Sequence, residues 1–267
     1  MPASPKRLSS LASLLLLALV ACRPSPPSAI DLPASPPTST PAPEPAPPPL
    51  FSAAPSSSAP LLIERIRVPN DLDVHVVRGD PASPPRTVFL AGICSNAAVY
   101  LYQLLGAAHA HGGVLTLEGD QACRGAAAGF HTYTQRPELQ RARIEAALRA
   151  AGAAGPPADG LTIVGYSLGA IVAERLHARW PALFPRVVLI APPWDPPVAK
   201  LRTARGVVAI SCSLDVPVRM ESAARSLRAA GVPALYLEMP GCRHGAVVDG
   251  ERVFDAAFAF LERADGR

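Results

Sequence analysis

A single serine stands at the centre of the segment Gly165-Tyr166-Ser167-Leu168-Gly169. A β-branched apolar run precedes this segment and a stretch of helical composition follows it. In the pattern G-x-S-x-G, a sharp turn from strand to helix presents the serine side chain, and glycines stand where a Cβ would collide. Such a hydroxyl attacks an acyl carbon when a base removes its proton and a carboxylate orients that base. The alternative is a turn serine in an inactive chain.

The elements that must position this serine begin with eight short apolar segments, which predict β-strands. The first two alternate polar and apolar residues, as an edge hairpin does. The later ones are nearly continuous apolar runs, which is typical of parallel strands covered on both faces. The predicted strands are Leu62–Val68, Val74–Val77, Thr87–Ala91, Val114–Glu118, Leu161–Gly165, Val187–Ile190, Val207–Ser211 and Leu235–Met239.

Segments of helical composition alternate with these strands, and Ser95 is a candidate cap for the first of them. Strand alternating with helix predicts a parallel α/β sheet with right-handed crossovers. The predicted helices are Asn96–Ala110, Pro137–Ala151, Leu168–Arg179, Val218–Ala230 and Arg252–Arg263.

With G-x-S-x-G after the fifth predicted strand, residues 61–264 resemble the α/β-hydrolase family of serine esterases and lipases. The resemblance implies a doubly wound, mostly parallel sheet of eight strands. About sixteen residues separate the sixth strand from the seventh, where relatives often insert a lid. We therefore expect no sizeable lid domain and an open site.

The resemblance also implies a triad in the chain order Ser, Asp or Glu, His. Asp215 follows the seventh predicted strand and His244 follows the eighth, so both meet Ser167 at the carboxyl edge of the sheet. Asp215 as a helix cap and His244 as a surface histidine are the alternatives. Asp195, after the sixth strand, is the rival carboxylate. The other histidines fit less well, since they lie in an early strand, in helices or in a long loop: His75, His109, His111, His131 and His177.

A developing oxyanion needs backbone N–H donors that are already oriented toward it. The amide of Leu168 is one expected donor, because it follows the nucleophile at a helix N-terminus. The other is expected from Ile93 or Cys94, in the loop after the third strand. This loop begins Ala91-Gly92, whereas relatives frequently have His-Gly, and that departure leaves the local geometry open.

Four cysteines of the predicted domain form an even set in a chain with an export signal. If the strand order of the family holds, the resemblance implies disulfides Cys94–Cys123 and Cys212–Cys242, one beside the oxyanion loop and one joining the Asp215 and His244 loops. Four free thiols are the alternative. Zinc is not expected, because no paired C-x-x-C spacing occurs, and no metal or other cofactor is predicted.

Two aromatic residues are candidates for substrate binding: Tyr166, beside the serine, and Trp194, after the sixth strand. Ordinary packing is the alternative for both. Asp120 lies near the same edge and either binds a polar group of the substrate or stabilises a turn.

The N-terminal residues predict export. Lys6 and Arg7 precede an apolar run over residues 11–20, and Leu19-Val-Ala-Cys22 resembles a bacterial lipoprotein processing box. This resemblance implies that Cys22 is lipidated. An ordinary signal peptide is the alternative.

Three regions follow from this composition: a signal peptide over residues 1–22, a tether over 23–60 that holds 14 of the 32 prolines, and a folded domain over 61–267. We expect the protein at the bacterial cell envelope, held on a membrane by its lipid. The net charge of +4 is not concentrated in a basic run, so nucleic-acid binding is not expected.

The sequence thus predicts an exported serine hydrolase that cleaves a small-molecule or lipid carboxylic ester through an acyl-enzyme. A thioesterase, peptidase or acyltransferase would use the same residues, and fold-level analogy does not separate them. A non-catalytic surface lipoprotein that uses the fold as a binding module is the rival from another class.

Overall fold

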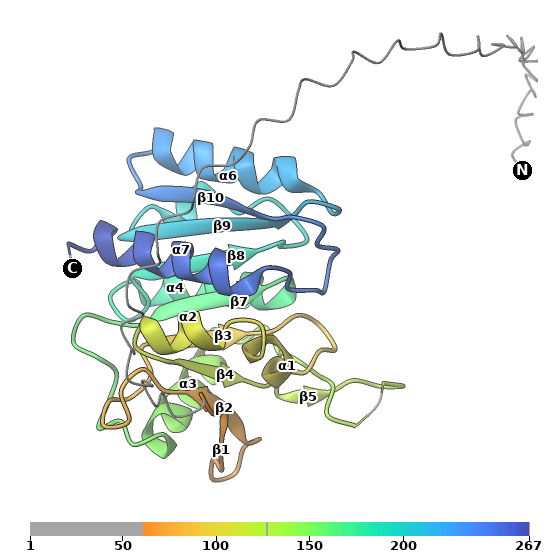
Figure 1. Cartoon of the computed structure of the whole chain (residues 1–267), viewed down its shortest axis with the longest axis vertical. Coiled ribbons are helices and arrows are strands. Elements are labelled where there is room, and N and C mark those ends of the chain that lie inside the picture. Colours follow the sequence, from red (N-terminus) through yellow and green to blue (C-terminus); the bar gives the residue numbers. More distant parts are fainter. Residues whose placement is uncertain (1–60, 127, 267) are drawn as a thin grey trace, which may run out of the picture. The chain divides into compact units, whose positions relative to one another are not determined.

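In a computed structural model of the chain, residues 61–126 and 128–266 are described, and they form a sheet covered by helices on both faces (Figure 1). The strands of this sheet are ordered β1-β2-β4-β3-β7-β8-β9-β10. β2 is antiparallel to β1 and to β4, and the remaining pairs are parallel. Their bounds are β1 Glu64–Ile66, β2 Val74–Val77, β3 Thr87–Leu90, β4 Val114–Leu117, β7 Thr162–Tyr166, β8 Arg186–Ile190, β9 Gly206–Cys212 and β10 Ala234–Met239.

The helices divide between the two faces and enclose two apolar cores. Buried side chains of α3, α4, α5 and α6 pack on one face, and those of α1, α2 and α7 pack on the other. The predicted doubly wound, mostly parallel sheet of eight strands is therefore confirmed. The helices are α1 Ala97–Leu101, α2 Leu105–Ala110, α3 Pro137–Ala150, α4 Leu168–Arg179, α5 Val198–Leu201, α6 Pro217–Ala229 and α7 Gly250–Ala264.

The region predicted as one helix, Asn96–Ala110, consists of two helices, and its cap differs from the prediction. Asn96, not Ser95, caps α1 by accepting a hydrogen bond from the Ala98 N–H. Ser95 instead donates its hydroxyl to the Gly92 carbonyl, at 2.8 Å. At the start of the second helix, the Glu251 carboxylate of α7 accepts the N–H groups of Gly106 and Ala107. A carboxylate from the far end of the chain thus caps the second helix.

Two further elements were not predicted. The hairpin of β5 (Gln121–Ala122) and β6 (His131–Thr132) follows β4, and the short helix α5 follows β8. Each is too short to produce a periodic pattern in the sequence.

The predicted signal peptide, Cys22 and the proline-rich tether lie outside the described residues. Within residues 61–126 and 128–266, no helix has the length and apolar character needed to cross a bilayer.

Candidate active site

Ser167 occupies a strained turn between β7 and α4. Its backbone has φ 53° and ψ −114°, a conformation that costs a non-glycine residue of order 1–3 kcal/mol. The flanking glycines permit it, because a Cβ on Gly165 would lie 2.3 Å from the Gly169 carbonyl oxygen and one on Gly169 would lie 2.2 Å from the Leu90 carbonyl oxygen. The tight turn therefore needs both glycines.

Three side chains from separate loops form one hydrogen-bonded chain at this turn. The His244 Nε2 lies 2.9 Å from the Ser167 Oγ, and the His244 Nδ1 lies 2.8 Å from the Asp215 Oδ2. The three residues follow β7, β9 and β10, so the parallel sheet brings them to its carboxyl edge. A hydroxyl, an imidazole and a carboxylate in this order can perform acyl transfer.

The rival carboxylate does not join this chain. Asp195 is 85% exposed at its side chain and pairs with Arg219, whose Nε lies 3.0 Å from its Oδ1. Three of the other histidines bond to groups elsewhere. His111 lies between two carboxylates, the His109 Nδ1 bonds to the Arg78 carbonyl, and the His177 Nδ1 bonds to the Phe184 carbonyl.

The loop after β3 approaches the serine closely. A Cβ on Gly92 would lie 3.4 Å from the Ser167 Cβ, so this loop and the turn are in direct contact. Leu168 is the first residue of α4, where backbone N–H groups have no partner within the helix. Cys94 has φ 48°, a left-handed conformation in the same loop as Ile93. Oxyanion stabilisation by Leu168, Ile93 or Cys94 stays a prediction.

Two disulfides tie down the loops around the serine. Cys94 is joined to Cys123, and Cys212 is joined to Cys242, the same pairs that the family resemblance implies. The first connects the loop after β3 to the β5–β6 hairpin. The second connects the end of β9 to the loop that carries His244.

Tyr166 contacts the loop that carries His244. Its ring is 1% exposed and packs against the His244 imidazole with the ring centroids 5.7 Å apart, and its hydroxyl accepts a 2.5 Å hydrogen bond from the Gly245 N–H. Burial raises the pKa of Tyr166 to about 12, so the hydroxyl is neutral at ordinary pH. These contacts favour a positioning role over the predicted substrate contact, although the ring also lines the cavity described next.

An apolar cavity of about 440 Å³ opens beside Ser167. Trp194, the other predicted binding residue, does not line it; its half-exposed side chain lies on the loop after β8. Most of the residues that line this cavity were not predicted from the sequence. The one indication was Val99, an apolar residue on a predicted helix, whose side chain is exposed in the structure. The wall comprises residues 92–96, 99–100 and 103, Phe130, and residues 166–167 and 244–247.

Two carboxylates at the end of β4 have structural partners. Asp120 accepts hydrogen bonds from the Thr134 backbone and side chain and from Gln140, which supports the turn role over substrate binding. Glu118, which sequence reasoning missed, is buried and accepts the N–H of Ala97 at the start of α1. Burial raises the pKa of this carboxyl. Glu118 therefore holds the helix that forms the cavity wall.

No group of three or more potential metal ligands occurs among the described residues. The hydrogen-bonded chain at Ser167 consists of side chains alone.

Comparisons with known proteins support the fold. No protein-family model matches the sequence, and no curated protein matches it. Solved structures do match, including 2-hydroxy-6-oxo-6-phenylhexa-2,4-dienoate hydrolase from Rhodococcus sp. strain RHA1, at 16% identity and a TM-score of 0.52 over 78% of this chain and 100% of that one.

A thermostable carboxylesterase from a metagenomic library is 15% identical, with a TM-score of 0.52 over 77% of this chain and 89% of that one. Esterase PE8 is 20% identical, with a TM-score of 0.53 over 75% of this chain and 100% of that one. The chain therefore has the α/β-hydrolase fold. At these identities the likeness extends to the fold alone.

Proposed function

We propose that this protein is a serine hydrolase that cleaves carboxylic esters. The observation that carries the proposal is the unbroken hydrogen-bonded chain from the Ser167 hydroxyl through His244 to Asp215 at the mouth of an apolar cavity. The esterases and hydrolases among the structural neighbours agree with this chemistry.

In the proposed reaction, the His244 Nε2 takes the Ser167 proton as the Oγ attacks the ester carbonyl carbon. Asp215 holds the imidazole through Nδ1 and stabilises its charged form. The N–H groups of Leu168 and of Ile93 or Cys94 receive the developing oxyanion. His244 then protonates the departing alcohol, and water, activated by the same imidazole, releases the acid from the acyl-enzyme.

The cavity favours uncharged esters of modest size. Among the described residues that line it, none is Asp, Glu, Lys or Arg, so a charged acyl group would lose its hydration without gaining an oppositely charged partner. A volume of about 440 Å³ falls in the range of small-molecule sites. Thioester, peptide and acyl-transfer substrates remain the alternatives for the same residues.

A fluorophosphonate probe tests the nucleophile. We expect the wild-type protein to label and Ser167→Ala to lose labelling, while Ser222→Ala, a change of an exposed serine on α6, labels normally. A folded wild-type protein that never labels would favour the non-catalytic binding module. A series of p-nitrophenyl esters of increasing acyl length then defines the substrate range.

Export and lipidation at Cys22 form the second part of the proposal. The two disulfides support it, because such bonds persist in oxidising compartments outside the cytosol. Metabolic labelling with a fatty-acid analogue in a bacterial host tests it. We expect the wild-type chain to incorporate the label and Cys22→Ser to lose it.

A further inference from the structure

Exposed large apolar side chains gather at one edge of the domain. Most of them lie on loops and helix ends at the carboxyl ends of the parallel strands, the edge that holds Ser167. Six of them, defined here as the apolar collar, are Ile93, Tyr102, Phe130, Trp194, Leu214 and Val218. Tyr102, Leu214 and Val218 are 64%, 56% and 66% exposed.

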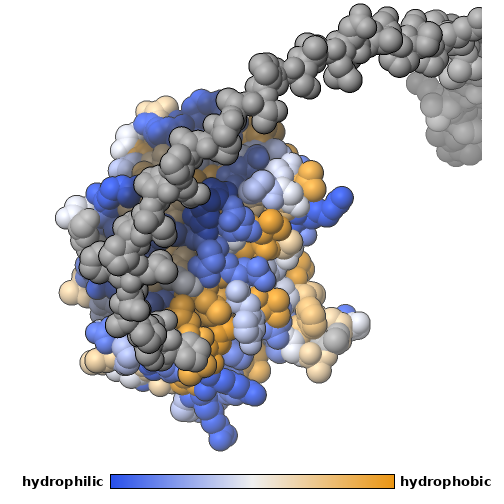
Figure 2. All heavy atoms as spheres, in the orientation of Figure 1, coloured by the Kyte–Doolittle hydropathy of each residue, from blue (hydrophilic) through white to orange (hydrophobic). Residues whose placement is uncertain are grey.

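The opposite edge and the helical flanks differ from the collar. Among the described residues, Leu61 and Leu62 are the exposed large apolar residues outside the carboxyl edge, and they precede β1 at the amino edge. None lies on α2, α3, α4 or α7. In Figure 2, apolar atoms lie among hydrophilic ones along the right-hand margin, where β10 ends and α7 begins in Figure 1. A concentration of exposed apolar side chains at one edge, beside a cavity mouth, marks an interaction surface.

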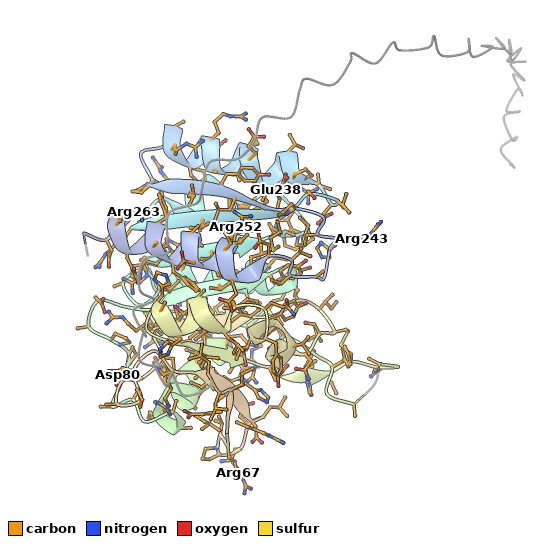
Figure 3. The ribbon with its side chains drawn as sticks, viewed as in Figure 1. Arg67, Asp80, Glu238, Arg243, Arg252 and Arg263 are labelled. Atoms are coloured by element: carbon orange, nitrogen blue, oxygen red, sulfur yellow. A yellow bond between two sulfur atoms is a disulfide. The ribbon has the colours of Figure 1, made fainter. Side chains whose placement is uncertain are left out.

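The charges at this edge include two arginines and the exposed carboxylate of Glu238, near the end of β10. Arg243 and Arg124 are exposed, and neither forms an ion pair with the described residues. Figure 3 shows Arg243 projecting outward from this edge, with Arg263 at the opposite edge. The acidic residues of the loops after β8, β9 and β10 each have a partner: Asp195 with Arg219, Asp215 with His244, and Asp249 with Arg252.

We propose that the collar, with Arg243 and Arg124, docks the domain on an anionic phospholipid bilayer, with the cavity mouth facing the lipid. Aromatic and aliphatic side chains enter the headgroup boundary, where Trp and Tyr are favoured. The two arginines meet the negative surface potential of anionic lipids.

A bilayer fits this surface better than a folded protein partner. Ile93 and Phe130 of the collar line the cavity, so a rigid partner seated on the collar would cover the mouth. A fluid bilayer covers the same side chains and still admits a lipid chain to the cavity. The segment 23–60 comprises 38 residues, which at about 3.1 Å each span about 118 Å when extended, so a lipid on Cys22 leaves length for the mouth to reach the same membrane.

The two tryptophans of the chain provide an orientation test. Trp194 belongs to the collar. Trp180 is the C-cap residue of α4, a helix of 12 residues that is about 18 Å long and begins beside Ser167. The full chain with Cys22→Ser and Ser167→Ala is mixed with phosphatidylcholine and phosphatidylglycerol vesicles that contain brominated acyl chains. We expect bromine to quench Trp194 in the Trp180→Phe variant and to leave Trp180 unquenched in the Trp194→Phe variant.

Matched substitutions test the residues. In the same background, combining Tyr102→Ser, Leu214→Ser and Val218→Ser should weaken vesicle binding at least tenfold, since three exposed apolar side chains leave the lipid. Leu62→Ser at the other edge should leave the binding unchanged. Arg243→Gln should weaken binding about fivefold on anionic vesicles, whereas Arg263→Gln should not.

Equal quenching of both tryptophans, absence of Trp194 quenching, or binding indifferent to the collar variants would overturn the proposal. Concentration-dependent dimerisation without vesicles that the collar variants abolish would instead assign the surface to a second copy. Because every sample carries Ser167→Ala, docking is measured without turnover. Failure of the fluorophosphonate test would therefore remove the proposed esterase and leave the docking result standing.

Discussion

Replacing Tyr166 with phenylalanine tests how the histidine loop is held. The substitution removes one oxygen and keeps the ring that packs against His244. The N–H of Gly245 then loses its 2.5 Å acceptor directly beside the imidazole. We expect the loop to spend less time in the geometry that places His244 Nε2 2.9 Å from the Ser167 Oγ.

The size of the effect follows from the exposure of the two partners. The Tyr166 hydroxyl is buried, but Gly245 is exposed, so water can reach its N–H when the hydroxyl is absent. The cost is then that of one ordinary hydrogen bond, about 1 kcal/mol, rather than the larger penalty of an orphaned buried donor. This value corresponds to a fall in kcat of about five- to tenfold and, for a domain of this size, a Tm lower by about 2–4 °C.

Steady-state hydrolysis of a p-nitrophenyl ester separates the two roles of Tyr166. A positioning role lowers kcat and leaves KM nearly constant, because the substrate does not contact the hydroxyl. Tyr236→Phe is the control, since its hydroxyl bonds to Ser211 on β9 and is not part of the cavity wall. An unchanged kcat with a raised KM would refute the positioning role and restore Tyr166 as a substrate contact.

Three further outcomes are expected. Asp215→Asn should lower kcat by about 10³–10⁴, the scale for a misoriented histidine in such a chain, while Asp195→Asn should leave the ester hydrolysis rate within twofold. Replacing both Cys212 and Cys242 with serine removes a disulfide that links residues 30 positions apart. The unfolded chain then gains conformational entropy worth about 3–4 kcal/mol, so a thermal melt should show a Tm lower by about 7–14 °C. Burial lowers the pKa of His177 below its ordinary 6.5, so the unfolded state binds the proton more readily and the free energy of unfolding should decrease as the pH falls below about 6.5. Urea titrations at several pH values should show this loss in the wild-type protein and a smaller one in His177→Gln; equal slopes would contradict the assignment.

Local patterns in the sequence were sufficient to predict the main sheet. Buried parallel strands are continuous apolar runs, and the observed β3, β7 and β8 lie within one residue of the predicted segments. The turn at Ser167 was also predictable, because its two glycines are demanded by contacts within a few residues of each other and with the neighbouring strand. Asp215 and His244 could be named because strand ends of a parallel sheet converge on one edge.

The remaining features depend on contacts between distant segments. The start of α2 is capped by the carboxylate of Glu251, which is 145 residues from Gly106. The hydroxyl of Tyr166 reaches Gly245 across 79 residues, so nothing near Tyr166 in the sequence indicates that it holds a loop. Trp194 was a candidate because it follows a strand, but it is not among the residues that line the cavity and its side chain is half exposed, so its role stays a prediction.

No lid domain lies between β8 and β9, so the loops around Ser167 must hold their own geometry. A lid orders the residues beneath it when it closes, whereas here the three loops must already hold their geometry in an open site. Each has a covalent or hydrogen-bonded restraint: Cys94–Cys123 on the loop after β3, Cys212–Cys242 at the Asp215 loop, and Tyr166 under His244. Each loop is restrained by a bond that does not belong to the Ser167–His244–Asp215 hydrogen bonds. In the proposed reaction, this restraint would reduce the reorganisation required when the serine attacks. The same bonds restrain the loops of the exposed edge that we propose meets a bilayer.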